Sequence, residues 1–178
     1  LVQGIGDDAA VIATSSPTWW HLTTDLLAEG IHFDMKSATP ESVGYRAAMA
    51  NLSDIAAMGA VPRYLLISLA IPKTWTRSDV HKLYTGLMKA CRLYDVTLVG
   101  GDTSASKAGL FLSITLVGAT SRRLALFRHG ANVGDHIYVS GTLGDSLAGL
   151  TLLMESTSSG PSRKKKSWAP PTGAPTRS

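Results

Sequence analysis

Apolar and polar residues recur with two different periods along the first 60 residues. Residues 9–14 form an apolar run that predicts a short buried strand. The aromatic and β-branched residues of segment 19–25 predict a second strand, which ends in the polar triplet Thr-Thr-Asp. Thr39 followed by Pro40 is typical of a helix start, and the apolar residues beyond it have helical spacing. They predict a helix that ends near Gly59.

The rest of the chain predicts strands and helices in mixed order. Apolar segments predict strands at residues 63–71, 96–99, 110–117 and 136–140, and helical spacing predicts helices from Ser78 to Tyr94 and from Asp145 to Leu153. Roughly six strands and three helices in this order indicate an α+β or α/β domain.

The composition changes after Met154. Residues 155–178 contain half of the eight prolines, many serines and the basic run at 163–166, and they carry the whole net charge of +4. This composition predicts a disordered or aberrant tail beside a globular domain of residues 1–154. A solvated charge run is a plainer interpretation of the basic residues than a localisation signal. Because the rest of the chain is neutral, nucleic acid is not expected as a partner.

Several absences restrict the class of protein. The single cysteine excludes a disulfide framework and a cysteine-based zinc site. There is no apolar run of about 18 residues and no signal-peptide pattern, so we expect no membrane partner and a cytoplasmic location. The chain begins without methionine, and we therefore also expect a fragment of a longer protein.

Asp54 is the most informative single position because it is the only charged residue in segment 47–60. No Lys or Arg on the same predicted helix is spaced to pair with it, and a buried carboxylate without a cation is costly. One interpretation places Asp54 on an exposed stripe with Asn51. The many alanines on every side leave little room for such a stripe, so a functional carboxylate is favoured.

Other carboxylates follow small residues at predicted strand ends and loops. They are Asp7 and Asp8 after Gly-Ile-Gly, Asp25 after two threonines, and Asp102 after two glycines. Each alone is more often a turn or cap residue. As a set, with threonine hydroxyls and no interleaved Lys or Arg, they predict oxygen ligands for Mg²⁺. Mg²⁺ in turn indicates a polyphosphate substrate.

Other chemistries find little support in the sequence. The phosphate-loop pattern GxxxxGK[ST] and the protein-kinase signatures are missing, no serine occupies a nucleophile elbow, and Cys91 has the spacing of a core residue. Arg128 precedes a glycine-rich turn and is either a solvated loop arginine or a phosphate contact. His32 is equally a packed surface histidine or a substrate contact.

Six motifs occur in a characteristic order. They are GIGDDAA (4–10), TTD with GIHF (23–25 and 30–33), NLSDIAAMGA (51–60), GGDT (100–103), RHGANVGD (128–135) and SGTLGDS (140–146). Together they resemble the thiamine-monophosphate kinases, a family of the aminoimidazole-ribonucleotide synthetase superfamily. The block at 51–60 is shared loosely across the superfamily, whereas TTD followed by GIHF is more particular to the kinases.

The resemblance implies an N-terminal domain with a mixed sheet and helices packed on one face, an α+β (α/β sandwich) fold. It implies phosphorylation of thiamine phosphate to thiamine diphosphate by ATP, with several Mg²⁺ ions and no covalent enzyme intermediate. The implied metal ligands are Asp8, Thr23, Thr24, Asp25, Asp54 and Asp102. The implied ATP contacts are Gly101, Asp102 and Arg128, and the implied substrate contact is His32. The resemblance further implies a homodimer formed through the sheets of the N-terminal domains.

This sequence departs from the family pattern in ways that affect function. The second domain, with an Asp-Ser-Asp-Gly type motif, is absent, and so are the elements expected before Gly4, so we expect impaired activity. Two alternatives remain open. One is another ATP-using enzyme of the superfamily, for selenophosphate synthesis, hydrogenase maturation or purine synthesis, although a reactive Cys for selenophosphate synthesis is not seen. The other is a non-catalytic dimerisation module whose carboxylates only cap turns.

Overall fold

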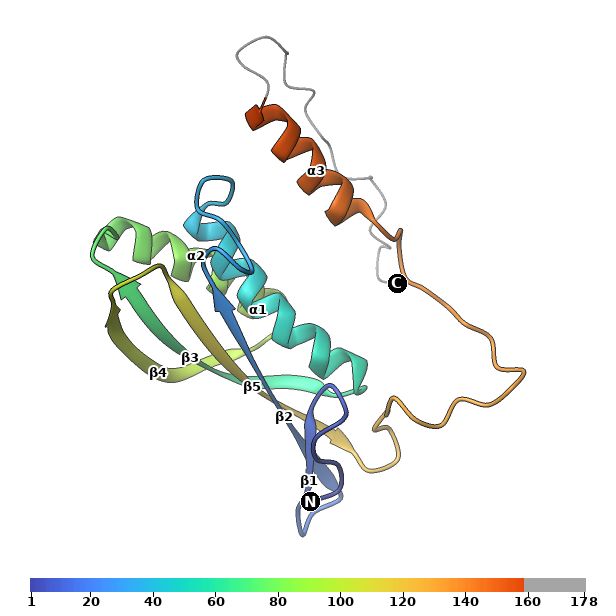
Figure 1. The fold of residues 1–178 in the computed structure, drawn as a ribbon. Helices are drawn as coiled ribbons and strands as arrows, with labels where there is room; N and C mark the ends of the chain where they lie inside the picture. The colour runs from blue at the N-terminus through green and yellow to red at the C-terminus, as the bar shows by residue number, and fades with distance from the viewer. Residues whose placement is uncertain (159–178) are drawn as a thin grey trace. The chain divides into compact units, whose positions relative to one another are not determined.

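A computed structural model describes residues 1–158, which form five strands and three helices (Figure 1). The elements are β1 Ala10–Ala13, β2 Thr18–Ala28, α1 Pro40–Ala57, β3 Val61–Pro72, α2 Arg77–Leu93, β4 Thr97–Ser106, β5 Phe111–Ser121 and α3 Asp145–Ser158. The chain divides into two compact units, Leu1–Asp135 and a second that begins at His136. The first unit contains the whole sheet with α1 and α2, and the second contains α3.

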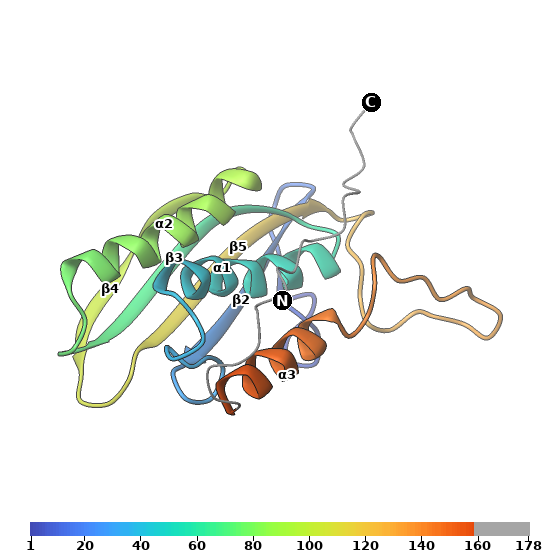
Figure 2. The ribbon, with the colours of Figure 1, turned by 90° about the horizontal axis from the view of Figure 1, so that it is seen from above.

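The sheet is mixed. Its strand order is β1-β2-β5-β3-β4, in which β3 and β4 are parallel and the other neighbouring pairs are antiparallel. β3 and β4 can lie parallel because α2 connects them and provides the long crossover that parallel strands need. Figures 1 and 2 show α1 and α2 side by side on one face of the sheet. The expected α+β fold with helices on one face is therefore confirmed.

The core lies between this face of the sheet and the two helices. In the central strand β5, Leu112, Ile114 and Leu116 are fully buried and alternate with partly exposed residues. The strand thus turns alternate side chains toward the helices. From the helices, Ile55 of α1 and Leu87 of α2 are also fully buried. The opposite face of the sheet stays uncovered within this unit.

The two helices begin at capping boxes and cross in very close contact. Thr39 caps α1 as predicted, whereas the cap of α2 is Thr76 rather than the expected Ser78. A Cβ added to Gly44 of α1 would lie 2.0 Å from the carbonyl oxygen of Leu83, and one added to Gly86 of α2 would lie 1.8 Å from that of Glu41. Only glycine allows backbones to approach so closely, so this pair fixes α1 relative to α2.

One predicted strand is wrong. Residues 136–140 form no strand in the described structure, and Ile137 and Tyr138 are 99% and 87% exposed. The apolar pattern alone cannot make a strand, because a strand also needs a hydrogen-bonded neighbour and a face to bury. The segment belongs to the second unit, where the described residues offer neither.

Two polar motifs lie inside strands rather than at strand ends, which corrects the sequence interpretation. β2 continues past Asp25 to Ala28, and β4 continues through Gly100 and Gly101 to Ser106. In β4 the pairing shifts between Leu65 and Leu66, where one residue of β4 is left unpaired as a bulge. At Gly101 the backbone has φ 154°, and an added Cβ would lie 1.7 Å from the carbonyl oxygen of Ile67. The strand can continue only because this residue is glycine.

The C-terminal end also differs in detail from the expectation. α3 runs to Ser158, so residues 155–158, assigned from sequence to the tail, are helical. The rest of the predicted tail lies outside the described residues. Among residues 1–158, no helix combines the length and the apolar character needed to cross a bilayer.

The helix crossing yields the first prediction. Gly86→Ala should destabilise the first unit by about 1–3 kcal/mol or more, because the new methyl group overlaps a backbone carbonyl that cannot move freely. In an open helix the same change would be favourable. Gly149→Ala in α3 is the matched control, since no atom lies within 4 Å of the added Cβ. Urea unfolding checks both variants, and equal midpoints would contradict the packing described.

Candidate functional site

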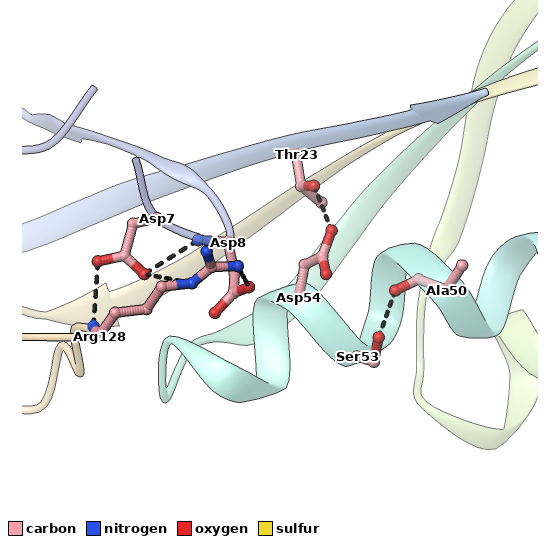
Figure 3. Close-up of polar contacts among 7 residues, drawn as sticks. All are labelled: Asp7, Asp8, Thr23, Ala50, Ser53, Asp54 and Arg128. Atoms are coloured by element: carbon pink, nitrogen blue, oxygen red, sulfur yellow. Dashed lines mark hydrogen bonds and ion pairs between the residues drawn. The ribbon is translucent and has the colours of Figure 1, made fainter. Parts of the chain in front are cut away.

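Strand β2 and helix α1 bring Thr23, Asp25 and Asp54 to the same side of the sheet. Thr23 and Asp25 are two residues apart on β2, so both side chains point to the face that α1 covers. The Thr23 hydroxyl donates a hydrogen bond of 2.6 Å to Oδ2 of Asp54 (Figure 3). Asp54 is partly buried. The partner of Asp54 is thus a hydroxyl group of β2 and not a cation of α1. Because Asn51 is buried, Asp54 and Asn51 do not form the exposed stripe that one interpretation expected.

Asp25 and Asp54 are close enough for their charges to repel. The pKa of Asp25 is raised, first by burial and then by the negative charge of Asp54, while His32 opposes the shift. Holding both carboxylates ionised in this space is unfavourable. A cation bound between them would relieve the repulsion, so the pair is suited to a positively charged ligand.

A second group lies where the N-terminal loop meets the segment after β5. The Arg128 guanidinium donates from Nη2 to Oδ1 of Asp8, and the Arg128 backbone N–H donates to Oδ2 of Asp7 at 3.2 Å (Figure 3). The bond from Arg128 lowers the pKa of Asp8, and Asp8 raises the pKa of Arg128. The charge of Asp54 adds to the raised pKa of Arg128. The two groups are therefore electrostatic neighbours.

His32 lies beside this site on the loop after β2. Its Nδ1 accepts the backbone N–H of Ala28 at 3.0 Å, and its carbonyl oxygen accepts Nη1 of Arg46 at 2.8 Å. In the neutral ring this leaves the proton on Nε2. The His32 side chain is exposed, and its ring influences the pKa of Asp25. It can thus present an N–H donor to a ligand bound near Asp25.

Two predicted ligands do not join the group within one chain. The Thr24 side chain points to the uncovered face, where its hydroxyl donates to the carbonyl oxygen of Ile114 at 3.0 Å. Asp102 lies on β4, three strands away from β2, which corresponds to about 14 Å at the usual strand spacing. It pairs in register with Ser68, whose side chain is exposed, so it also belongs to the uncovered face. Gly101 lies on the same strand.

Three buried polar groups near these elements were missed from the sequence. Asp7 was predicted only as one of the carboxylates suited to Mg²⁺, yet its side chain is 1% exposed and accepts the backbone N–H of Arg128. Asn51, one turn before Asp54, has a buried Oδ1 without a hydrogen-bond partner, and His21 has two such ring nitrogens. Burial lowers the pKa of His21. The burial of His21 could have been predicted from the alternation of side chains along β2, because His21 is two residues before Thr23 and lies on the same face.

The donor chemistry fits Mg²⁺ bound together with a phosphate ligand. Within residues 1–158, no three His, Cys, Asp or Glu residues are arranged to hold a metal ion by themselves. Mg²⁺ seldom needs such a cage, because it commonly binds one or two carboxylates and fills its remaining positions with water and substrate phosphate. The pair Asp25 and Asp54 supplies oxygen atoms alone and suits this mode. Arg128 suits the phosphate.

The repulsion at Asp25 yields the second prediction. At neutral pH, Asp25→Asn should stabilise the metal-free chain, because it removes a charge that folding makes less favourable. The gain should shrink as the pH falls through the raised pKa of Asp25 in the folded chain. It should vanish below 3.8, the ordinary pKa of this group, because Asp25 of the wild type is then protonated in the folded and the unfolded state alike. Thermal unfolding at several pH values measures the effect.

A second aspartate provides a control of opposite sign. Two hydrogen bonds from Thr76 lower the pKa of Asp79 at the start of α2, so Asp79→Asn should destabilise the chain at neutral pH. If both variants lose stability alike, the repulsion between Asp25 and Asp54 is not significant.

Comparison with known proteins gives a consistent result. Residues 6–120 match the family described as AIR synthase related protein, N-terminal domain. The chain is 39% identical over 154 residues to a thiamine-monophosphate kinase of Bacillus subtilis, covering 86% of this chain and 47% of the relative. It is 45% identical over 150 residues to the thiamine-monophosphate kinase of Aquifex aeolicus, with 84% and 47% covered. The chain thus spans about half the length of the curated relatives that it matches.

Solved structures agree with the sequence matches. A structure described as AaThiL complexed with AMPPCP and TMP superposes with a TM-score of 0.81 at 42% identity, covering 93% of this chain and 50% of that chain. A structure of thiamine monophosphate kinase from Aquifex aeolicus superposes with a TM-score of 0.76 at 42% identity, with 84% and 49% covered.

Proposed function

Because the chain belongs to the AIR synthase related protein family through its N-terminal domain, we propose that it forms the ATP- and Mg²⁺-binding half of a thiamine-monophosphate kinase. The reaction is the transfer of the γ-phosphate of ATP to thiamine phosphate, which gives thiamine diphosphate. Relatives that are 39% and 45% identical carry that name, and a similar structure is described as complexed with AMPPCP and TMP. The observation that carries the proposal is the Asp25–Asp54 pair beside Arg128.

The residues of this chain would bind and orient the reactants rather than attack them. Asp25 and Asp54, with Asp8 nearby, would supply carboxylate oxygens to Mg²⁺, and a bound ion would offset the charge of the phosphate oxygens. The Thr23 hydroxyl orients Asp54 through its hydrogen bond. Arg128 offers a guanidinium fork to a phosphate group, and His32 offers its Nε2–H to thiamine phosphate. No enzyme nucleophile is needed, since the acceptor is itself a phosphate oxygen.

The remaining predicted ligands, Thr24 and Asp102, lie on the uncovered face of the sheet. The uncovered face of the sheet exposes apolar side chains on its strands, including Leu26 (58% exposed), Tyr64 (46%) and Leu66 (41%). Such a surface favours association with another apolar surface. We propose a homodimer in which two uncovered faces pack together, so that Thr24 and Asp102 line the interface.

The whole activity belongs to the longer protein that the relatives represent. Since this chain matches about half of each relative, we expect it to bind ATP with Mg²⁺ but to phosphorylate thiamine phosphate poorly by itself. Other ATP-using enzymes of the superfamily are the runner-up, and the names of the similar relatives favour the thiamine-phosphate kinase over them. A non-catalytic dimerisation module would show no dependence of ligand binding on Mg²⁺.

Calorimetry with AMPPCP, a non-hydrolysable ATP analogue, tests this proposal. We expect binding that requires Mg²⁺ and that Asp54→Asn weakens at least tenfold, a loss of about 1.4 kcal/mol, because the metal loses a charged ligand. Asp95→Asn is the matched control. It removes the same charge from a turn with φ 55°, a conformation that Asn adopts readily. A folded wild-type chain that binds no AMPPCP, or binds it equally without Mg²⁺, would refute the proposal.

A further inference from the structure

Asp7 is a buried carboxylate among exposed neighbours. Its side chain is 1% exposed, whereas the side chains of Asp8 and Arg128 are 23% and 63% exposed. A buried carboxylate requires hydrogen bonds to offset the loss of its hydration. The hydrogen-bond partners of Asp7 therefore indicate the role of this carboxylate.

Those partners are the backbones of two residues that the proposed function uses. Oδ1 of Asp7 accepts the backbone N–H of Asp8 at 2.9 Å, and Oδ2 accepts the backbone N–H of Arg128 at 3.2 Å. Oδ1 also lies 4.0 Å from Nε of Arg128. A single carboxylate thus connects two segments that are 121 residues apart in the sequence. Figure 3 shows it on one side of the guanidinium, with Asp8 on the other.

The contact between Asp8 and Arg128 does not explain this arrangement by itself. Both side chains reach solvent, and ion pairs of that kind contribute little to holding long side chains in one place. A buried carboxylate that fixes the backbone on both sides is a stronger constraint, because either N–H would lose its partner without it. Asp7 determines where the guanidinium can reach.

We propose that Asp7 is the positioning residue of this site, and that its buried carboxylate fixes Arg128 beside Asp8 so that the guanidinium is preorganised for a nucleotide phosphate. Asp7 touches neither substrate nor metal in this account and acts through Arg128. The inference rests on the proposed function, which assigns Arg128 to phosphate and Asp8 to Mg²⁺. A preorganised arginine loses less freedom when it binds, which is how a remote carboxylate can strengthen binding.

The substitution that separates positioning from packing is Asp7→Asn. Asparagine has nearly the same shape, but its amide nitrogen cannot accept a hydrogen bond, so the N–H of Asp8 or of Arg128 must lose its partner. Asp135→Asn is the matched control. Asp135 also accepts a backbone N–H, that of Asn132 at 2.8 Å, and it follows Arg128 on the same segment without contacting Asp7 or Asp8.

Amide hydrogen exchange in the ligand-free chain tests the positioning directly. In the wild type, the Arg128 amide should exchange more slowly than the amides of His129 and Gly130, and Asp7→Asn should accelerate exchange at Arg128 or Asp8 about tenfold. Asp135→Asn should leave both amides unchanged. An unprotected Arg128 amide in the wild type would overturn the inference, even if the Asp7 variant failed to fold.

A double-mutant cycle then tests whether the positioning matters for nucleotide. The affinity for AMPPCP with Mg²⁺ is measured for the wild type, Asp7→Asn, Arg128→Ala and the double variant. Asp7→Asn should weaken binding about tenfold in the wild type and hardly at all once Arg128 is gone, because Asp7 acts through Arg128. Equal losses in both backgrounds would overturn the inference. A folded wild type that binds no nucleotide would refute the proposed function instead, while hydrogen exchange would still decide whether Asp7 fixes Arg128.

Discussion

The hydrogen bond from Thr23 to Asp54 connects the packing of the fold to the chemistry of the site. Helix α1 packs against β2, and its small residues Ala47 and Ala48 are fully buried. This close packing brings Asp54 against the strand, where its charge would be costly without a donor. The Thr23 hydroxyl supplies that donor at 2.6 Å and leaves the other oxygen of Asp54 for a cation. The close contact of Gly44 with Leu83 fixes α1 beside α2 on the same face of the sheet.

The site is assembled from segments that only the fold brings together. Asp25 comes from β2, Asp54 from α1, Asp8 from the N-terminal loop and Arg128 from the segment after β5. Burial and then the charge of Asp54 raise the pKa of Asp25, and the Arg128 guanidinium interacts favourably with the charges of Asp8 and Asp54. Such a balance suits a ligand that carries both a cation and phosphate groups, since each component has a partner of opposite charge already in place.

Much of the fold follows from the sequence, because helix caps and apolar patterns are strong local signals in this chain. Thr39 and Pro40 predict the start of α1, and the apolar alternation predicts β5, whose alternate residues are buried in the structure. The strand expected at 136–140 does not form, because an apolar pattern cannot show whether a neighbouring strand is available for hydrogen bonds. The continuation of β4 through Gly100 and Gly101 was not predicted either, since glycines usually interrupt strands.

The site was only partly predictable for a similar reason. The sequence identifies carboxylates without a cationic neighbour, but not the strand order that separates Asp102 from Asp25, nor the burial of Asp7. Alternation along β2 does place Thr23 and Asp25 on one face and Thr24 on the other. Contacts such as that of Arg128 with Asp7 link residues far apart in the chain and have no local signal.

The central claim is that Asp25 and Asp54 together bind Mg²⁺ for a nucleotide ligand. A double-mutant cycle tests it most directly. The affinity for AMPPCP is measured with and without Mg²⁺ for the wild type, Asp25→Asn, Asp54→Asn and the double variant. Each single variant should remove most of the affinity that Mg²⁺ adds, and the double variant should lose little more, because the two carboxylates serve one ion. A single variant that keeps the full effect of Mg²⁺, or losses that simply add in the double variant, would contradict the claim.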